Sequence, residues 1–184
     1  LHVPLSVQSE MTACTAVLAL SEDLKPQLLD MGICEVLLPL TDSPSIEVQG
    51  NSAAALGNLS SKADDYSPFN AVWEKPAGGL HGYLVRFLES DDTTFQHIAV
   101  WTLIQLLESG NRDLEQHIRE SPHLLQLVRQ LQSREDGSHT AEEDVDGTNQ
   151  DLSPEREIAA LSRRIEEILF DDSDGDDEGA GNTK

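Results

Sequence analysis

The segment Glu47–Ser60 reads EVQGNSAAALGNLS, an alanine- and leucine-rich stretch that predicts a long helix. Two other segments match it. Val7–Ser21 reads VQSEMTACTAVLALS and matches at an offset of 39 residues, and Phe95–Leu107 reads FQHIAVWTLIQLL and matches at an offset of 47 residues. The chain therefore contains an internal repeat, which indicates a fold built from stacked repeat units.

The residues between the long helices also follow one plan. After the first long helix comes a predicted short helix, Glu22–Met31, and then Gly32, a residue suited to the left-handed turn that ends a helix. A second helix, Ile33–Leu40, precedes the next long one. Three helices in a period of about 40–47 residues are typical of armadillo repeats. The predicted fold class is all-α, an armadillo-repeat right-handed superhelical solenoid.

Residues 1–132 are predicted to hold about three and a half such units. The fourth unit is expected to be partial and to have no third helix, so that the solenoid ends near residue 132 with a polar outer face. Asp91 and Asp92 are expected to cap a helix rather than to act as an acid–base pair. The later helices are predicted at Tyr66–Glu74, Leu80–Leu88, Thr93–Glu108, Asn111–Glu120 and Pro122–Leu131.

The rest of the chain divides into three predicted segments. Residues 133–152 are predicted to be a disordered acidic linker and residues 171–184 a disordered acidic tail, since both are polar and nearly free of apolar side chains. Residues 153–170 are predicted to form an amphipathic helix. This helix could dock on the solenoid, dock in a partner's groove, or remain solvated. Its apolar positions are Ile158, Leu161, Ile165, Ile168 and Leu169.

Charge and composition exclude several function classes. The formal net charge of −22 disfavours direct binding to nucleic acid, because an acidic chain repels phosphate backbones. The sequence has no polybasic cluster of the kind that binds anionic lipids, and it has no apolar run as long as a membrane span. Cys14 and Cys34 lie among apolar residues at helical spacing, so both are expected to be buried core thiols of a reducing compartment.

No motif indicates catalysis or a bound cofactor. The sequence lacks a GxSxG elbow, a phosphate loop and a glycine-rich nucleotide fingerprint, so we expect no catalytic residue and no cofactor. The six histidines show no metal-ligand spacing, so no metal site is expected either. An enzyme is therefore the function with the least support in the sequence.

The long helices carry the candidate binding residues. In a helical solenoid the third helices line the concave face, a groove in which extended peptides lie. Glu47–Ser60 places Asn51 and Asn58 on one helix face, with Ala54 between them. In the next unit the predicted stripe is His97, Trp101 and Gln105. We expect the amides to bond a peptide backbone and the indole to pack on side chains. The alternative is that these residues are structural.

Two stretches carry a family resemblance. The residues EVQGNSAAALGNLSS at Glu47–Ser61 and FLESDDTTFQHIAVWTLIQLLES at Phe87–Ser109 resemble the fungal vacuolar armadillo-repeat proteins. The resemblance covers about residues 1–132. The chain begins mid-pattern at Leu1, so we expect it to be a C-terminal fragment of a longer protein.

The resemblance implies a scaffold that tethers partner proteins at the cytosolic face of the vacuole membrane. Implied roles are vacuole inheritance, nucleus–vacuole contacts, vacuole fusion and selective autophagy. Partners would bind the groove through extended segments, at Asn51, Asn58, His97, Trp101 and Gln105. Family members reach the membrane through acyl chains on an N-terminal segment that this sequence does not include, so the fragment itself is expected to be soluble.

An alternative within the same fold is a nuclear-import adaptor of the importin-alpha type that binds basic peptides. Such adaptors resemble this chain but repeat a Trp-x-x-x-Asn pair along successive third helices. Here the corresponding pairs are Thr15 with Ala19, Ala54 with Asn58, and Trp101 with Gln105, and no unit keeps both residues.

Overall fold

The computed structural model describes residues 3–133 and 153–170, and all regular structure in these ranges is helical. The disordered linker was predicted for residues 133–152, but Ser133 is helical. Residues 134–152 and the predicted disordered tail at residues 171–184 lie outside the described residues. The helices are α1 (Leu5–Leu18), α2 (Lys25–Asp30), α3 (Ile33–Leu40), α4 (Ile46–Ser60), α5 (Ser67–Ala71), α6 (Gly79–Glu89), α7 (Thr93–Glu108), α8 (Arg112–Arg119), α9 (Pro122–Ser133) and α10 (Pro154–Phe170).

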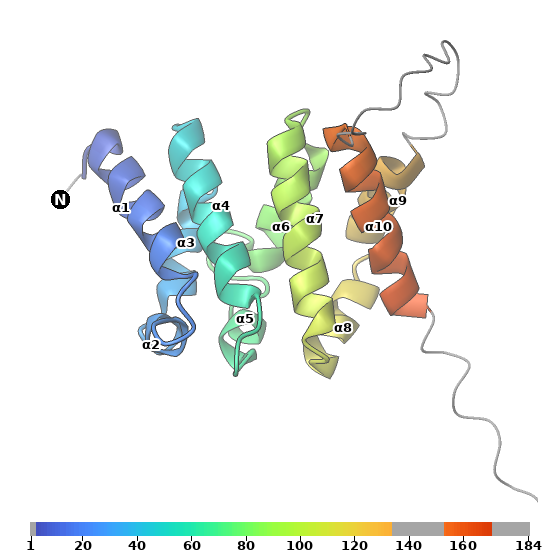
Figure 1. Ribbon diagram of the computed structural model, residues 1–184, viewed down its shortest axis with the longest axis horizontal. Coiled ribbons are helices and arrows are strands. Elements are labelled where there is room, and N and C mark those ends of the chain that lie inside the picture. The colour runs from blue at the N-terminus through green and yellow to red at the C-terminus, as the bar shows by residue number, and fades with distance from the viewer. Residues whose placement is uncertain (1–2, 134–152, 171–184) are drawn as a thin grey trace, which may run out of the picture.

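The helices are arranged as a row of repeated units (Figure 1). Helices α1, α4, α7 and α10 stand side by side along one face, and each contacts its neighbour. We call this surface the third-helix face. Helices α3, α6 and α9 form a second layer behind it, while the short helices α2, α5 and α8 lie along the lower edge in this view. The predicted all-α armadillo solenoid is confirmed.

The repeat of 47 residues between the second and third long helices is reproduced in side-chain hydrogen bonds. Gln49 donates to the carbonyl oxygen of Ser43, and Gln96 donates to that of Ser90. The side chains that cap α4 and α7 are also equivalent: Ser45 accepts from the amide of Val48, and Asp92 from the amides of Thr94 and Phe95. The predicted capping role of the aspartates at the start of α7 is therefore realised by Asp92.

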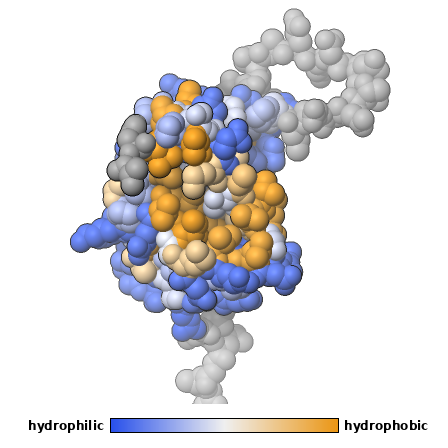
Figure 2. Space-filling view, turned by 90° about the vertical axis from the view of Figure 1, so that its left-hand side faces the viewer, coloured by the Kyte–Doolittle hydropathy of each residue, from blue (hydrophilic) through white to orange (hydrophobic). Residues whose placement is uncertain are grey.

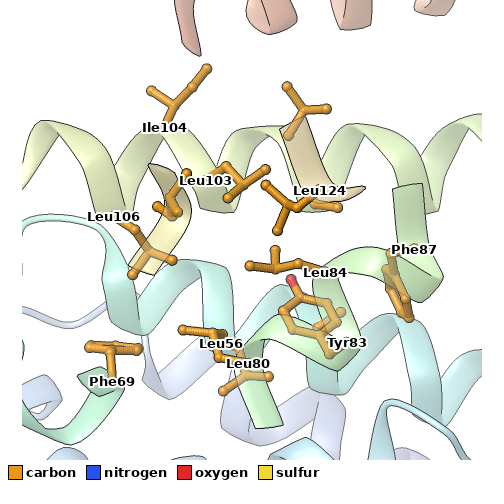
Figure 3. Packing of buried hydrophobic residues seen from close by; sticks show 14 of the residues in the cluster. Leu56, Phe69, Leu80, Tyr83, Leu84, Phe87, Leu103, Ile104, Leu106 and Leu124 are labelled. Atoms are coloured by element: carbon orange, nitrogen blue, oxygen red, sulfur yellow. The ribbon is translucent and has the colours of Figure 1, made fainter. Parts of the chain in front are cut away.

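Buried apolar side chains form one continuous core along the row of units (Figure 3). Leu56 of α4, Leu103 and Leu106 of α7, and Leu124 of α9 all belong to it and are fully buried. Tyr83 of α6 is also fully buried, and its hydroxyl lies 3.2 Å from Oγ1 of Thr102. Burial raises the pKa of Tyr83, so its phenol remains a neutral hydrogen-bonding group. Adjacent units are thus fixed against each other by a shared interior.

The fourth unit differs from the expectation that it lacks a third helix. Helix α10 contacts both α7 and α9, in the place that α7 takes beside α4 and α6 (Figure 1). Ile158, Ile165 and Leu169 are buried in this arrangement. A third helix in the fourth unit was not predicted, because twenty residues separate α9 from α10, whereas connections within helical units are usually short. The solenoid therefore extends past residue 132, and α10 docks on it.

The opposite end of the row exposes an apolar surface on α1 and α3 (Figure 2). Met11 is 61% exposed and Val36 is 58% exposed, although both are large apolar side chains. Together with Val3, Ile33 and Leu40 they line a hollow of about 400 Å³. Such exposure is unusual for a surface in contact with water.

Candidate protein-binding face

The two predicted asparagines of α4 tie this helix to α1. Asn51 Nδ2 donates to the carbonyl oxygen of Ser9 at 3.2 Å, and Asn58 Nδ2 donates to that of Ala16 at 2.9 Å. Both asparagine side chains are half-buried. The amide nitrogens thus connect two neighbouring third helices, a role that spacing along a single helix could not reveal.

Trp101 belongs to α7, its side chain packs toward α4, and it is half-buried. Its indole ring packs against Gly57, where an added Cβ would come within 2.7 Å of the ring carbon Cζ3. A glycine in α4 therefore provides the space that the ring occupies. Since part of the indole is accessible, Trp101 presents an apolar surface on the third-helix face.

Gln105 follows Trp101 by one helical turn and is also half-buried. Of the five predicted residues, Trp101 and Gln105 come together on α7, while Asn51 and Asn58 lie on the neighbouring α4. His97, the fifth, lies at the N-terminal end of α7. An amide beside a partly exposed indole can offer a hydrogen-bond donor, an acceptor and an apolar surface to a bound chain.

The side chain of His97 contacts α10. Its Nε2 atom lies 3.2 Å from Oε1 of Glu157, and both side chains are partly exposed. Near the other end of the same pair of helices, Arg164 lies 3.6 Å from Oε1 of Glu108. These two contacts place α10 parallel to α7. Neither contact was predicted from the sequence, although the amphipathic pattern of residues 153–170 was the available signal.

Five acidic residues lie together at the edge formed by α2 and α5. Lys25 is buried there and donates to the carbonyl oxygen of Ser61, and burial lowers the pKa of its ammonium group. A hollow of about 440 Å³ adjoins it. The charged residues that line this hollow are Glu22, Asp23, Lys25, Asp30, Lys62, Asp64 and Asp65.

The two cysteines differ. Cys34 is buried as expected, and burial raises the pKa of its thiol to about 12. Cys14 is exposed, which corrects the prediction that both are core residues. It lies on α1, at the end of the solenoid where no further helix among the described residues covers the surface.

Within the described ranges, no group of three histidine, cysteine or acidic side chains is arranged to hold a metal ion. In the same ranges, no helix combines the length and apolarity required to cross a bilayer.

Comparison with known proteins identifies a matching repeat family and several similar proteins. Residues 21–61 match the family model of the Armadillo/beta-catenin-like repeat. Vacuolar protein 8 of Schizosaccharomyces pombe is 53% identical over 174 residues, which is 95% of this chain and 30% of that protein. Vacuolar protein 8 of Aspergillus fumigatus is 57% identical over 169 residues, 92% of this chain and 28% of that protein. Vacuolar protein 8 of Saccharomyces cerevisiae is 45% identical over 131 residues, 71% of this chain and 23% of that protein.

The chain thus spans less than a third of the length of these relatives. A match of 174 residues within a chain of 184 residues necessarily includes residues 154–170. The similarity to the Schizosaccharomyces pombe protein therefore extends through α10, beyond the stretches that carried the resemblance in the sequence.

Proposed function

Because the chain belongs to the vacuolar protein 8 family of fungal armadillo-repeat proteins, we propose that it is a non-catalytic adaptor segment that binds partner proteins. The partners would bind as extended segments on the third-helix face. In the longer protein this binding would tether them at the cytosolic face of the vacuole membrane. Vacuole inheritance, nucleus–vacuole contacts, vacuole fusion and selective autophagy are the processes that such tethering would serve.

One observation carries the proposal. Trp101, a large aromatic residue, is left partly exposed on a row of aligned helices, with Gln105 one turn further along. Aromatic side chains of this kind are enriched where proteins bind each other, because they combine a rigid apolar area with low entropic cost. The position of Trp101 on the row of third helices, together with the family resemblance, supports a role in binding partner segments.

The residues of the third-helix face disfavour a nuclear-import receptor for basic peptides. Such receptors repeat a Trp-x-x-x-Asn pair, whereas α4 carries Ala54 with Asn58 and α7 carries Trp101 with Gln105. This departure favours the adaptor over the nuclear-import alternative.

The contribution of the asparagines is more limited than the sequence suggested. Asn51 and Asn58 use an amide N–H to bond α1, while their side-chain oxygens accept no hydrogen bond from the described residues. In our proposal these oxygens accept from the backbone of a bound segment, and Trp101 and Gln105 provide the remaining contacts. Replacing Asn58 would remove a helix–helix bond as well, so it is a poor probe of binding.

Site-specific photo-crosslinking tests the proposal. The full chain would carry benzoylphenylalanine at position 101 or 105, and a control would carry it at Gln126, an exposed position on α9. Each protein would be incubated with purified fungal vacuole membranes and illuminated. We expect crosslinks to vacuole-associated proteins from positions 101 and 105, mapping by mass spectrometry to extended segments. Equal crosslinking from position 126, or none from 101 and 105, would contradict the proposal.

A further inference from the structure

Four serines in the chain are followed directly by proline: Ser43, Ser67, Ser121 and Ser153. This dipeptide is the minimal recognition element of proline-directed serine/threonine protein kinases. All four lie in the described residues, so their surroundings can be compared. Phosphorylation needs an accessible hydroxyl and surroundings that tolerate two added negative charges.

Three of the four serines are poorly placed for this reaction. Ser43 is 6% exposed, and its Oγ accepts from the amide of Ser45. Ser121 is half-buried and donates to the carbonyl oxygen of His117 at 2.7 Å. Ser67 is exposed, but its hydroxyl donates to Oδ2 of Asp65 at 2.6 Å. A phosphate at position 67 would lie against that carboxylate, and like charges repel.

Ser153 is the fourth and has different surroundings. It is exposed at the start of α10, the upper end of this helix in Figure 1. Its Oγ accepts from the amide of Arg156 at 3.4 Å, and its hydroxyl donates to no described residue. Arg156 also places a cationic side chain three positions after the serine.

The first turn of α10 can open without exposing the core. Residues 153–157 are all exposed, and Ile158 is the first buried side chain of the helix. Opening this turn breaks the bond from the amide of Glu157 to the carbonyl oxygen of Ser153, together with the serine cap and the partly exposed pair of Glu157 with His97. A kinase that binds its substrate in an extended conformation therefore meets little resistance here.

We propose that Ser153 is a phosphorylation site for a proline-directed serine/threonine kinase that uses ATP. The Oγ atom forms a bond to the γ-phosphorus, the bond from that phosphorus to the ADP oxygen breaks, and the hydroxyl proton is released. The product is phosphoserine at the N-cap of α10, with ADP as the second product.

The modification strengthens the start of α10. A phosphate at a helix N-terminus accepts charge-assisted hydrogen bonds from amides that lack an intrahelical partner, here those of Glu155 and Arg156, and interacts favourably with the helix dipole. Pro154 has no N–H to contribute. The carboxylates of Glu155 and Glu157 oppose the added charge, but both are exposed and screened by solvent. Because α10 packs on α7, the firmer cap stabilises one border of the third-helix face.

The site is tested by incubating the folded full chain with a purified cyclin-dependent kinase and Mg–ATP, followed by peptide mass spectrometry. We expect one phosphoryl group, at Ser153, and its loss in Ser153→Ala. The matched variants Ser67→Ala and Ser121→Ala should be phosphorylated like the original chain, and Arg156→Gln more slowly. Absence of phosphate at Ser153, or its main occurrence at Ser67 or Ser121, would overturn the assignment.

The effect on α10 is measured by amide hydrogen exchange before and after phosphorylation. The amides of residues 155–158 should exchange at least about twofold more slowly in the phosphorylated chain, since helix-dipole interactions are of this order. Unchanged or faster exchange would show that the two glutamates outweigh the helix N-terminus, and would refute the proposed strengthening.

Discussion

The indole of Trp101 rests on Gly57, and no larger residue fits beneath it without a shift. A Cβ at position 57 would lie 2.7 Å from one ring carbon of Trp101 and 2.9 Å from Oγ1 of Thr102. Both contacts are closer than van der Waals packing permits. The position of the candidate binding residue on α7 is thus determined by the absence of a side chain on α4.

Gly57→Ala should therefore destabilise the protein and move Trp101. Overpacking of this kind costs about 1–3 kcal/mol, which outweighs the gain of about 0.5–1 kcal/mol from replacing glycine in a helix. Urea denaturation would measure the free energy of unfolding, and the tryptophan emission spectrum would report the altered surroundings of the ring.

Gly50→Ala is the matched control in the same helix. Its added Cβ would meet only the ring of Phe95, at 3.5 Å, an ordinary contact. This variant should be stabilised by about 0.5–1 kcal/mol through helix propensity. Equal effects at positions 50 and 57 would show that Trp101 does not depend on Gly57.

Features that depend on local sequence could be predicted, whereas features that depend on contacts between helices could not. Helix α3 was predicted at its observed bounds, since Gly32 and the break at residues 41–45 are local signals. The stripe on α7 was also predictable from helical spacing. The bonds of Asn51 and Asn58 to α1 were not, because they depend on how two helices approach each other. The docking of α10 likewise depends on contacts across a long interval of sequence.

Thiol labelling should distinguish the two cysteines. Cys14 is exposed and should react with Ellman's reagent in the folded protein as fast as a small free thiol. Cys34 is buried, and its thiol pKa is raised to about 12, so reaction requires unfolding. We expect one equivalent of rapid release without denaturant and two in urea. Rapid release should vanish in Cys14→Ser, whereas its persistence would contradict the burial of Cys34.

His81 makes stability depend on pH. Burial, followed by repulsion from His123, lowers the pKa of His81 below its usual value of 6.5, although Glu74 acts in the opposite sense. Below that value the unfolded chain binds a proton more readily than the folded one. The stability from neutral His81 is therefore complete above about pH 6.5 and declines as pH falls toward the lowered pKa.

The comparison of His81→Gln with the original chain isolates this effect. Acidification also relieves repulsion within a chain of net charge −22, so the absolute trend of either protein is ambiguous. The difference in unfolding free energy between the two proteins should be smaller at about pH 5.5 than at about pH 7.5. A difference that grows on acidification would mean that the folded state favours protonated His81.

Removing apolar volume from α10 should destabilise the whole solenoid, because this helix closes the fourth unit. Ile165 is fully buried in α10, and this helix contacts α7 and α9. Ile165→Ala should lower the free energy of unfolding by about 2–5 kcal/mol, the usual cost of such a cavity. The surface ion pair of Arg129 with Glu166, at 2.8 Å, should matter far less, so Arg129→Ala should cost about 1 kcal/mol or less. Urea denaturation followed by circular dichroism measures both. If Ile165→Ala were as stable as Arg129→Ala, α10 would not be held by its apolar face, and the fourth unit would be complete without it.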